Sequence, residues 1–147
     1  MRIASASHYN TANLAAILAV ALITVLLWRN YRRRGQVVRG AGIAPAVDAA
    51  LGRLLAGETR FVVLSVSPAV YLQFATEPNG AVLAEANCPA DNRPAESVLS
   101  TAGLSVVPGP PNYRATLARA DIGRLAGLVR DYLDALRAES ITIRTAR

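Results

Sequence analysis

Hydrophobic residues in this chain form one long continuous run, followed by short segments separated by turn residues. Residues 3–28 contain no Asp, Glu, Lys or Arg, and residues 14–28 read LAAILAVALITVLLW. With residues 9–13 this makes about 20 residues, which at about 1.5 Å per residue matches the ~30 Å hydrocarbon core of a bilayer. The run is apolar on all sides rather than along one stripe. The pattern therefore predicts a single transmembrane helix over residues 9–28.

The residues that flank this run predict its orientation. Aromatic and basic side chains typical of membrane interfaces border it, namely Tyr9, Trp28, Arg29, Tyr31, Arg32, Arg33 and Arg34. The arginine cluster follows the run, so the positive-inside rule places residues 1–8 outside and residues 29–147 in the cytoplasm, with the span in the inner (plasma) membrane. The same arginines would attract anionic lipid headgroups. No small-residue cleavage site lies near Trp28, which favours an uncleaved signal-anchor over a signal peptide.

Beyond a basic, glycine-containing linker at residues 29–42, short periodic segments predict a small α+β domain at residues 43–138. Pro45 and an apolar stripe that Gly57 ends predict an opening helix. Three strands are predicted in RFVVLSVS, AVYLQFAT and AVLAEANC, and a Pro-Asn-Gly turn joins the second to the third. These three segments predict an antiparallel meander.

The second half of the domain continues with helices and strands in alternation. We expect a short helix at residues 95–102, a brief extended stretch at 104–107 and a strand at 112–118. A long helix that Asp121 caps then runs to about residue 138. The predicted order is α-β-β-β-α-(β)-β-α, an antiparallel sheet with helices packed on it. Residues 139–147 are expected to be a loose tail or a short edge strand.

The charge distribution argues against a nucleic-acid partner. The formal net charge is +6, with 16 basic and 10 acidic side chains and no lysine. Residues 1–40 contain six arginines and no acid, whereas the ten arginines and ten acids of residues 41–147 cancel. A neutral domain offers no net field that would attract phosphates.

Cysteine and histidine counts restrict the chemistry of the domain. The chain has one Cys and one His, so it can form no internal disulfide and supplies no structural zinc ligand set. The single histidine, His8, precedes the predicted span and cannot join a Ser-His-Asp arrangement in the domain. We therefore expect no catalytic residues, no cofactor and no metal, and we expect Cys88 to be a small buried residue.

A few polar side chains of the predicted strands are candidates for structural or binding roles. With the turn at residues 77–80, Glu85 would lie opposite Leu72 on a covered face, where Arg114 is the candidate partner for a structural ion pair. Tyr71 and Gln73 form a mildly polar strand face. Together with Tyr113 they are the candidate partner surface, because tyrosine recurs at protein-binding sites.

Several of these segments resemble one family of small domains. The opening helix, FVVLSVSPAVYLQFA, the glycine turn with AVLAEANC, LSTAGLSVVPGPPNY and the final helix resemble the type III secretion chaperone-like/YbjN-like (TY-Chap) superfamily over residues 43–138. The resemblance implies a non-enzymatic α+β domain that binds other proteins, often as a dimer. It supplies no site residues.

Two functional hypotheses therefore stand ahead of a third. The first is a membrane-anchored protein-binding domain, an accessory or assembly subunit of a larger integral-membrane complex. The second is a membrane-tethered chaperone that holds a secreted or membrane client. The third, an enzyme with an undetected site, would need a polar-lined pocket of a few hundred Å³. A homodimer is compatible with each of them.

Overall fold

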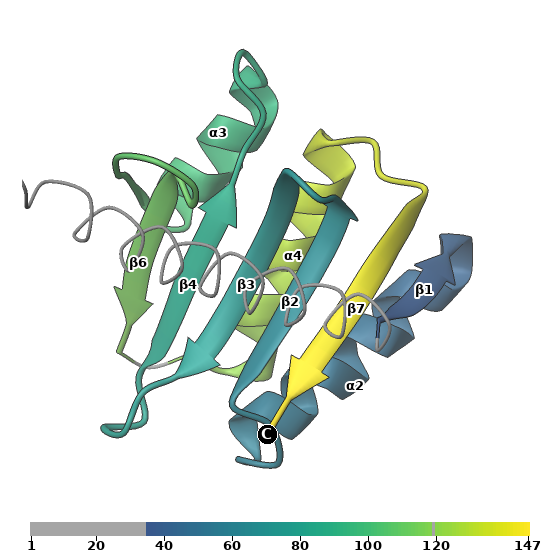
Figure 1. Ribbon diagram of the computed structural model, residues 1–147, viewed down its shortest axis with the longest axis vertical. Helices are drawn as coiled ribbons and strands as arrows, with labels where there is room; N and C mark the ends of the chain where they lie inside the picture. Colours follow the sequence, from purple (N-terminus) through teal and green to yellow (C-terminus); the bar gives the residue numbers. More distant parts are fainter. Residues whose placement is uncertain (1–34, 119) are drawn as a thin grey trace, which may run out of the picture. The chain divides into compact units, whose positions relative to one another are not determined.

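The computed structural model describes residues 35–118 and 120–147, which form an α+β domain (Figure 1). Its elements are, in order, β1 Gln36–Arg39, the short 3-10 helix η1 Gly40–Gly42, α2 Ile43–Leu55, β2 Phe61–Ser67, β3 Val70–Thr76, β4 Val82–Asn87, α3 Arg93–Thr101, β5 Ser105–Val106, β6 Tyr113–Leu117, α4 Ile122–Ala135 and β7 Ser140–Ala146. The predicted α+β class and the β2–β3–β4 meander are confirmed.

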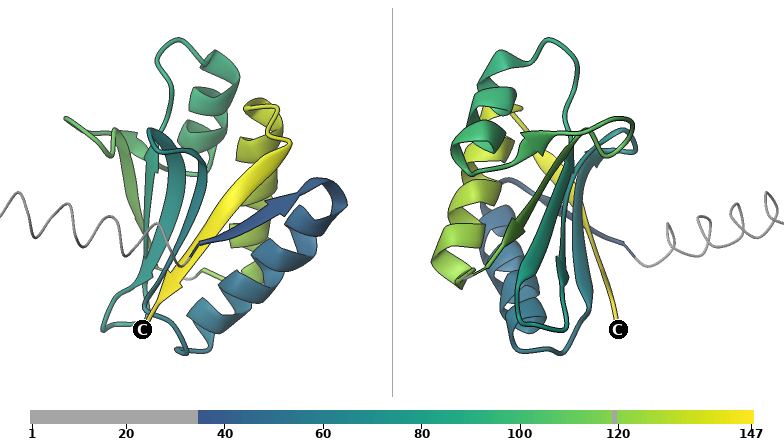
Figure 2. Two further views of the ribbon diagram at one scale, coloured as in Figure 1. Left: turned by 45° about the vertical axis from the view of Figure 1, so that its right-hand side comes forward. Right: turned by 90° about the vertical axis from the view of Figure 1, so that its left-hand side faces the viewer.

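All seven strands belong to one antiparallel sheet in the order β1-β7-β2-β3-β4-β6-β5. The three helices lie on the same face of this sheet, and α4 packs between α2 and α3 (Figure 2). Among the described residues, no helix covers the other face. Antiparallel sheets often bury one face and leave the other to solvent or to a partner.

Alternation along each strand sends one set of side chains into a single hydrophobic core beneath the helices. The sheet contributes alternate residues of five strands to this core, namely Val62, Leu64, Leu72, Phe74, Val82, Ala84, Ala86, Tyr113, Leu117, Ile141 and Ile143. The helices contribute Leu51 and Leu54 from α2, Leu99 from α3, and Leu125 and Tyr132 from α4. Each helix thus packs an apolar side against the sheet, although Leu55 and Ile122, at helix ends, stay exposed.

Side-chain caps fix where two of the helices begin. Asn92 accepts a hydrogen bond from the Ala95 N–H at 3.1 Å at the start of α3. Asp121 accepts one from the Arg124 N–H at 2.8 Å at the start of α4, as the sequence predicts. Each cap satisfies a backbone donor that the helix itself leaves without a partner.

Both ends of the described chain differ from the prediction, because they pair with each other. Residues 139–147 are not a loose tail or an edge strand: β7 lies inside the sheet, between β2 and β1 (Figure 1). Part of the predicted linker forms β1, whose Val38 lies opposite Ile141 of β7. The domain therefore begins at Gly35 rather than at residue 43.

The register between β3 and β4 also differs from the prediction by one residue. The Glu77 N–H donates to the Ala81 carbonyl at 2.8 Å, so the turn contains three residues, 78–80. Gly80 has a φ of 81°, the left-handed conformation that this turn requires and that glycine adopts at little cost. Glu85 consequently lies opposite Gln73 rather than Leu72 and belongs to the face without helices.

The predicted transmembrane helix lies outside the described residues. Within residues 35–118 and 120–147, no helix combines the length and the apolar character needed to cross a bilayer.

Because β7 lies inside the sheet, mutations in it should lower the free energy of unfolding, which they would not do in a loose tail. Ile143 is 5 % exposed and packs beneath the helices, so Ile143→Ala should lower the free energy of unfolding by about 2–4 kcal/mol. Thr142 lies on the opposite face, and Thr142→Ala should cost less than about 1 kcal/mol. Chemical denaturation of both variants measures the difference. Equal, small effects would contradict the assignment of β7 to the core.

Candidate protein-binding surface

The sheet face without helices presents a continuous surface of alternate strand residues, called here the open face. Its members include Val37, Arg39, Phe61, Val63, Ser65, Tyr71, Gln73, Ala75, Leu83, Glu85, Asn87, Arg114, Thr116, Thr142 and Arg144. They come from six strands, and Figure 2 presents this face edge-on, opposite the helices. The open face contains a single acidic residue, Glu85.

A row of directly opposed residues crosses the open face from β7 to β6. Arg144 lies opposite Val63, Val63 opposite Gln73, Gln73 opposite Glu85, and Glu85 opposite Arg114. Directly opposed residues on one face have Cβ atoms about 5 Å apart, so their side chains interact. The row therefore places the only carboxylate of the open face between an amide and an arginine.

Glu85 is held by both of these neighbours. Its Oε1 accepts a hydrogen bond from Arg114 Nε at 2.8 Å and forms an ion pair with Arg114 Nη2 at 2.6 Å, and its Oε2 accepts a hydrogen bond from Gln73 Nε2 at 2.5 Å. The Glu85 side chain is 10 % exposed and that of Arg114 is 51 % exposed. A nearly buried carboxylate with two hydrogen bonds and an ion pair fixes the guanidinium, while half of the Arg114 side chain stays available to a partner.

Tyr71 lies beside this network on the same face. Partial burial and the negative charge of Glu85 both raise the pKa of the Tyr71 hydroxyl, so Tyr71 stays neutral at physiological pH. Its half-buried ring offers apolar area with a polar tip. Tyrosine and arginine are the residue types that most often anchor protein interfaces.

The structure places the three candidate surface residues on two different faces of the sheet. Tyr71 and Gln73 lie on the open face as the strand alternation predicts, but Tyr113 does not join them. The register of β6 turns Tyr113 toward the helices, where it is 7 % exposed within the core. The surface residue of β6 is its neighbour Arg114, which the sequence suggests only as an ion-pair partner for Glu85.

The membrane-interface candidates lie outside the described residues. These are Tyr9, Trp28, Arg29, Tyr31, Arg32, Arg33 and Arg34, and the single histidine, His8, precedes them. Their roles stay predictions.

Cys88 is buried at 4 % exposure in the core, as predicted. Burial is the main reason that the pKa of its thiol is raised, which favours the unreactive protonated form. The Asn112 side chain forms two hydrogen bonds with the Cys88 backbone, at 2.8 and 3.0 Å, and thereby holds the chain before β6 against the end of β4. Nothing in the sequence pattern indicates this contact.

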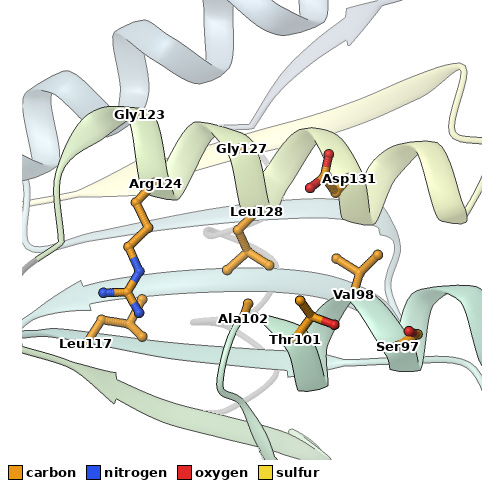
Figure 3. Close-up of a pocket in the computed structure, with 10 residues that line it drawn as sticks. All are labelled: Ser97, Val98, Thr101, Ala102, Leu117, Gly123, Arg124, Gly127, Leu128 and Asp131. Atoms are coloured by element: carbon orange, nitrogen blue, oxygen red, sulfur yellow. The ribbon is translucent and has the colours of Figure 1, made fainter.

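Two grooves cross the helical layer, and the sequence indicates neither. One, of about 450 Å³, lies between α3 and α4 (Figure 3). The other, of about 380 Å³, lies between α2 and α4. Both reach the size that an enzyme pocket would need, yet neither is lined by Cys or His. Within the described part of the chain, no group of three or more His, Cys, Asp or Glu is placed to hold a metal ion.

The Glu85–Arg114 pair predicts an asymmetric response to mutation. Arg114→Leu leaves a nearly buried carboxylate without its cation and should cost about 1–3 kcal/mol of unfolding free energy. Glu85→Leu leaves an arginine that can turn to water, so it should cost about 1 kcal/mol or less. The double variant should recover most of the loss of Arg114→Leu. Equal costs for the two single variants in urea denaturation would contradict this account.

Comparison with known proteins adds no family to these findings. No protein-family model, no curated protein and no solved structure matches the chain.

Proposed function

We propose that this chain is a non-catalytic, membrane-anchored protein-binding domain, an accessory or assembly subunit of a larger integral-membrane complex. The observation that carries the proposal is the open face: one whole side of the sheet has no described helix over it. This side holds Arg114, which Glu85 fixes in place, and the half-buried Tyr71. The anchoring part of the proposal depends on the continuous apolar run at residues 9–28.

The open face suits a folded protein partner better than a small molecule. Its polar groups are spread along a row of paired strands, and neither of the two grooves lies on it. Arginine and tyrosine, both present on the open face, are residue types that often anchor protein interfaces. Ligand pockets, in contrast, are concave and enclose most of the ligand.

Affinity purification of the full-length chain from gently solubilised native membranes tests this proposal. We expect a fixed set of multi-span proteins in near-equal amounts. Tyr71→Ala, which removes an anchor, and Thr116→Arg, which adds bulk at an exposed position of the open face, should each reduce their recovery by about tenfold or more. Ser100→Arg makes the same kind of change at an exposed position of α3 and should leave recovery unchanged.

Three results would contradict the proposal. Recovery of the same partners with all variants would exclude the open face as the binding surface. Soluble proteins at low and variable amounts would favour the tethered chaperone. Recovery of the chain alone would exclude a stable complex altogether.

A further inference from the structure

Charge is distributed unevenly between the two sides of the domain. The three helices carry four arginines and four acids, so together they are formally neutral. The open face carries Arg39, Arg114 and Arg144 against a single acid, Glu85, which leaves it with a formal charge of +2. The other nine of the ten acids lie on the helices or in loops. A domain without net charge therefore presents one positively charged face.

Glu85 does not remove this charge from the surface. Its carboxylate is nearly buried, whereas the Arg114 side chain is 51 % exposed and Arg39 is exposed. Within residues 35–118 and 120–147, Arg39 forms no ion pair. A partner that covers exposed guanidinium groups takes them out of water, which is unfavourable unless the partner supplies hydrogen-bond acceptors. Carboxylates are the acceptors that match a guanidinium best in charge and geometry.

The arginines lie near the two edges of the open face. Arg39 and Arg144 belong to β1 and β7 at one edge, and Arg114 belongs to β6 near the other. Three strands lie between β7 and β6, so the backbones of Arg144 and Arg114 are about 19 Å apart at about 4.8 Å per strand. Between them, the open face carries the half-buried Tyr71 and Leu83 and no arginine. Protein interfaces commonly have a centre that is depleted in charge and a polar rim.

We propose that the open face binds an acidic surface of its protein partner, with carboxylates opposite the arginines at both edges. The inference rests on the proposed function, since it names the chemistry of the partner that would cover this face. In the predicted topology the domain lies in the cytoplasm, where the short loops of multi-span proteins are enriched in Lys and Arg. Such loops would be repelled, so the acidic surface belongs to a folded cytoplasmic domain of the partner.

An anionic lipid surface matches the open face less well. Segments that bind anionic lipids through charge contain about four to eight Lys or Arg. The open face has three arginines, and one of them is paired with Glu85. The charge is also absent from its middle strands, where a flat lipid surface would make the closest contact.

Charge variants of the full-length chain test the inference, by affinity purification from gently solubilised native membranes. Arg39→Glu should reduce the recovery of the multi-span proteins about fivefold or more, whereas Arg39→Lys keeps the charge and should retain most of it. Near the other edge, Thr116→Glu should reduce recovery about threefold more than Thr116→Gln, which has the same size and no charge. Arg124→Glu reverses an exposed charge on α4 and should have no effect. The melting temperature should stay near that of the unmodified chain in all variants, because each position is exposed.

Salt provides a second measurement on the same complex. A change from about 0.1 M to about 1 M NaCl shortens the Debye length from about 10 Å to about 3 Å. Recovery with the unmodified chain should therefore fall about fivefold or more over this range. With Arg39→Glu the decline should be shallower, because one attractive charge has become repulsive.

Two results would overturn the inference and leave the proposed function intact. One is a set of multi-span proteins that Tyr71→Ala loses but Arg39→Glu and Thr116→Glu retain. The other is a recovery that salt does not change. Recovery of the chain alone would instead contradict the proposed function, and this inference with it.

A further measurement separates a protein partner from lipid. The full-length Thr116→Cys variant is reconstituted without other proteins in phosphatidylcholine vesicles, with and without phosphatidylserine. The thiol at position 116 should react with maleimide at the same rate in both. Protection by phosphatidylserine alone would show that the open face lies on lipid, and it would overturn the inference.

Discussion

One backbone hydrogen bond decides which residues of β4 face the helices and which face outward. The Glu77 N–H binds the Ala81 carbonyl across a three-residue turn, and the left-handed Gly80 makes that turn possible. Because side chains alternate along a strand, a shift of one residue would exchange the two faces of β4. Val82, Ala84 and Ala86 would leave the core, and Glu85 would enter it without Gln73 opposite. The ion pair with Arg114, the tyrosine beside it and the open face all depend on this turn.

The domain therefore has two surfaces with different properties. On one side, three helices cover the core, and two grooves run between them. On the other side, the bare sheet holds one buried carboxylate and a fixed arginine. In our proposal the open face binds a protein partner.

Local patterns predict most of the secondary structure but not how the ends of the domain meet. The helices and the β2–β4 meander follow from apolar spacing, caps and turn residues. The positions of β1 and β7 do not follow from such local patterns, because these two strands pair with each other although more than a hundred residues separate them in the chain. A strand such as SITIRTA alternates clearly, yet its place inside the sheet depends on a partner that sequence alone does not identify. Residue types alone suggest the Glu85–Arg114 ion pair. Which face of the sheet carries this pair depends on the length of the turn between β3 and β4, which the sequence does not fix.

The central claim is that a protein covers the open face in the native membrane, and cysteine accessibility tests it directly. Thr116→Cys places a thiol on the open face, Ser100→Cys places one on α3, and the native Cys88 is buried. The account predicts that the thiol at position 116 reacts with maleimide about tenfold or more slowly in native membranes than in the purified chain. The thiol at position 100 should react equally in both. An equal rate at position 116 in both preparations would contradict the account.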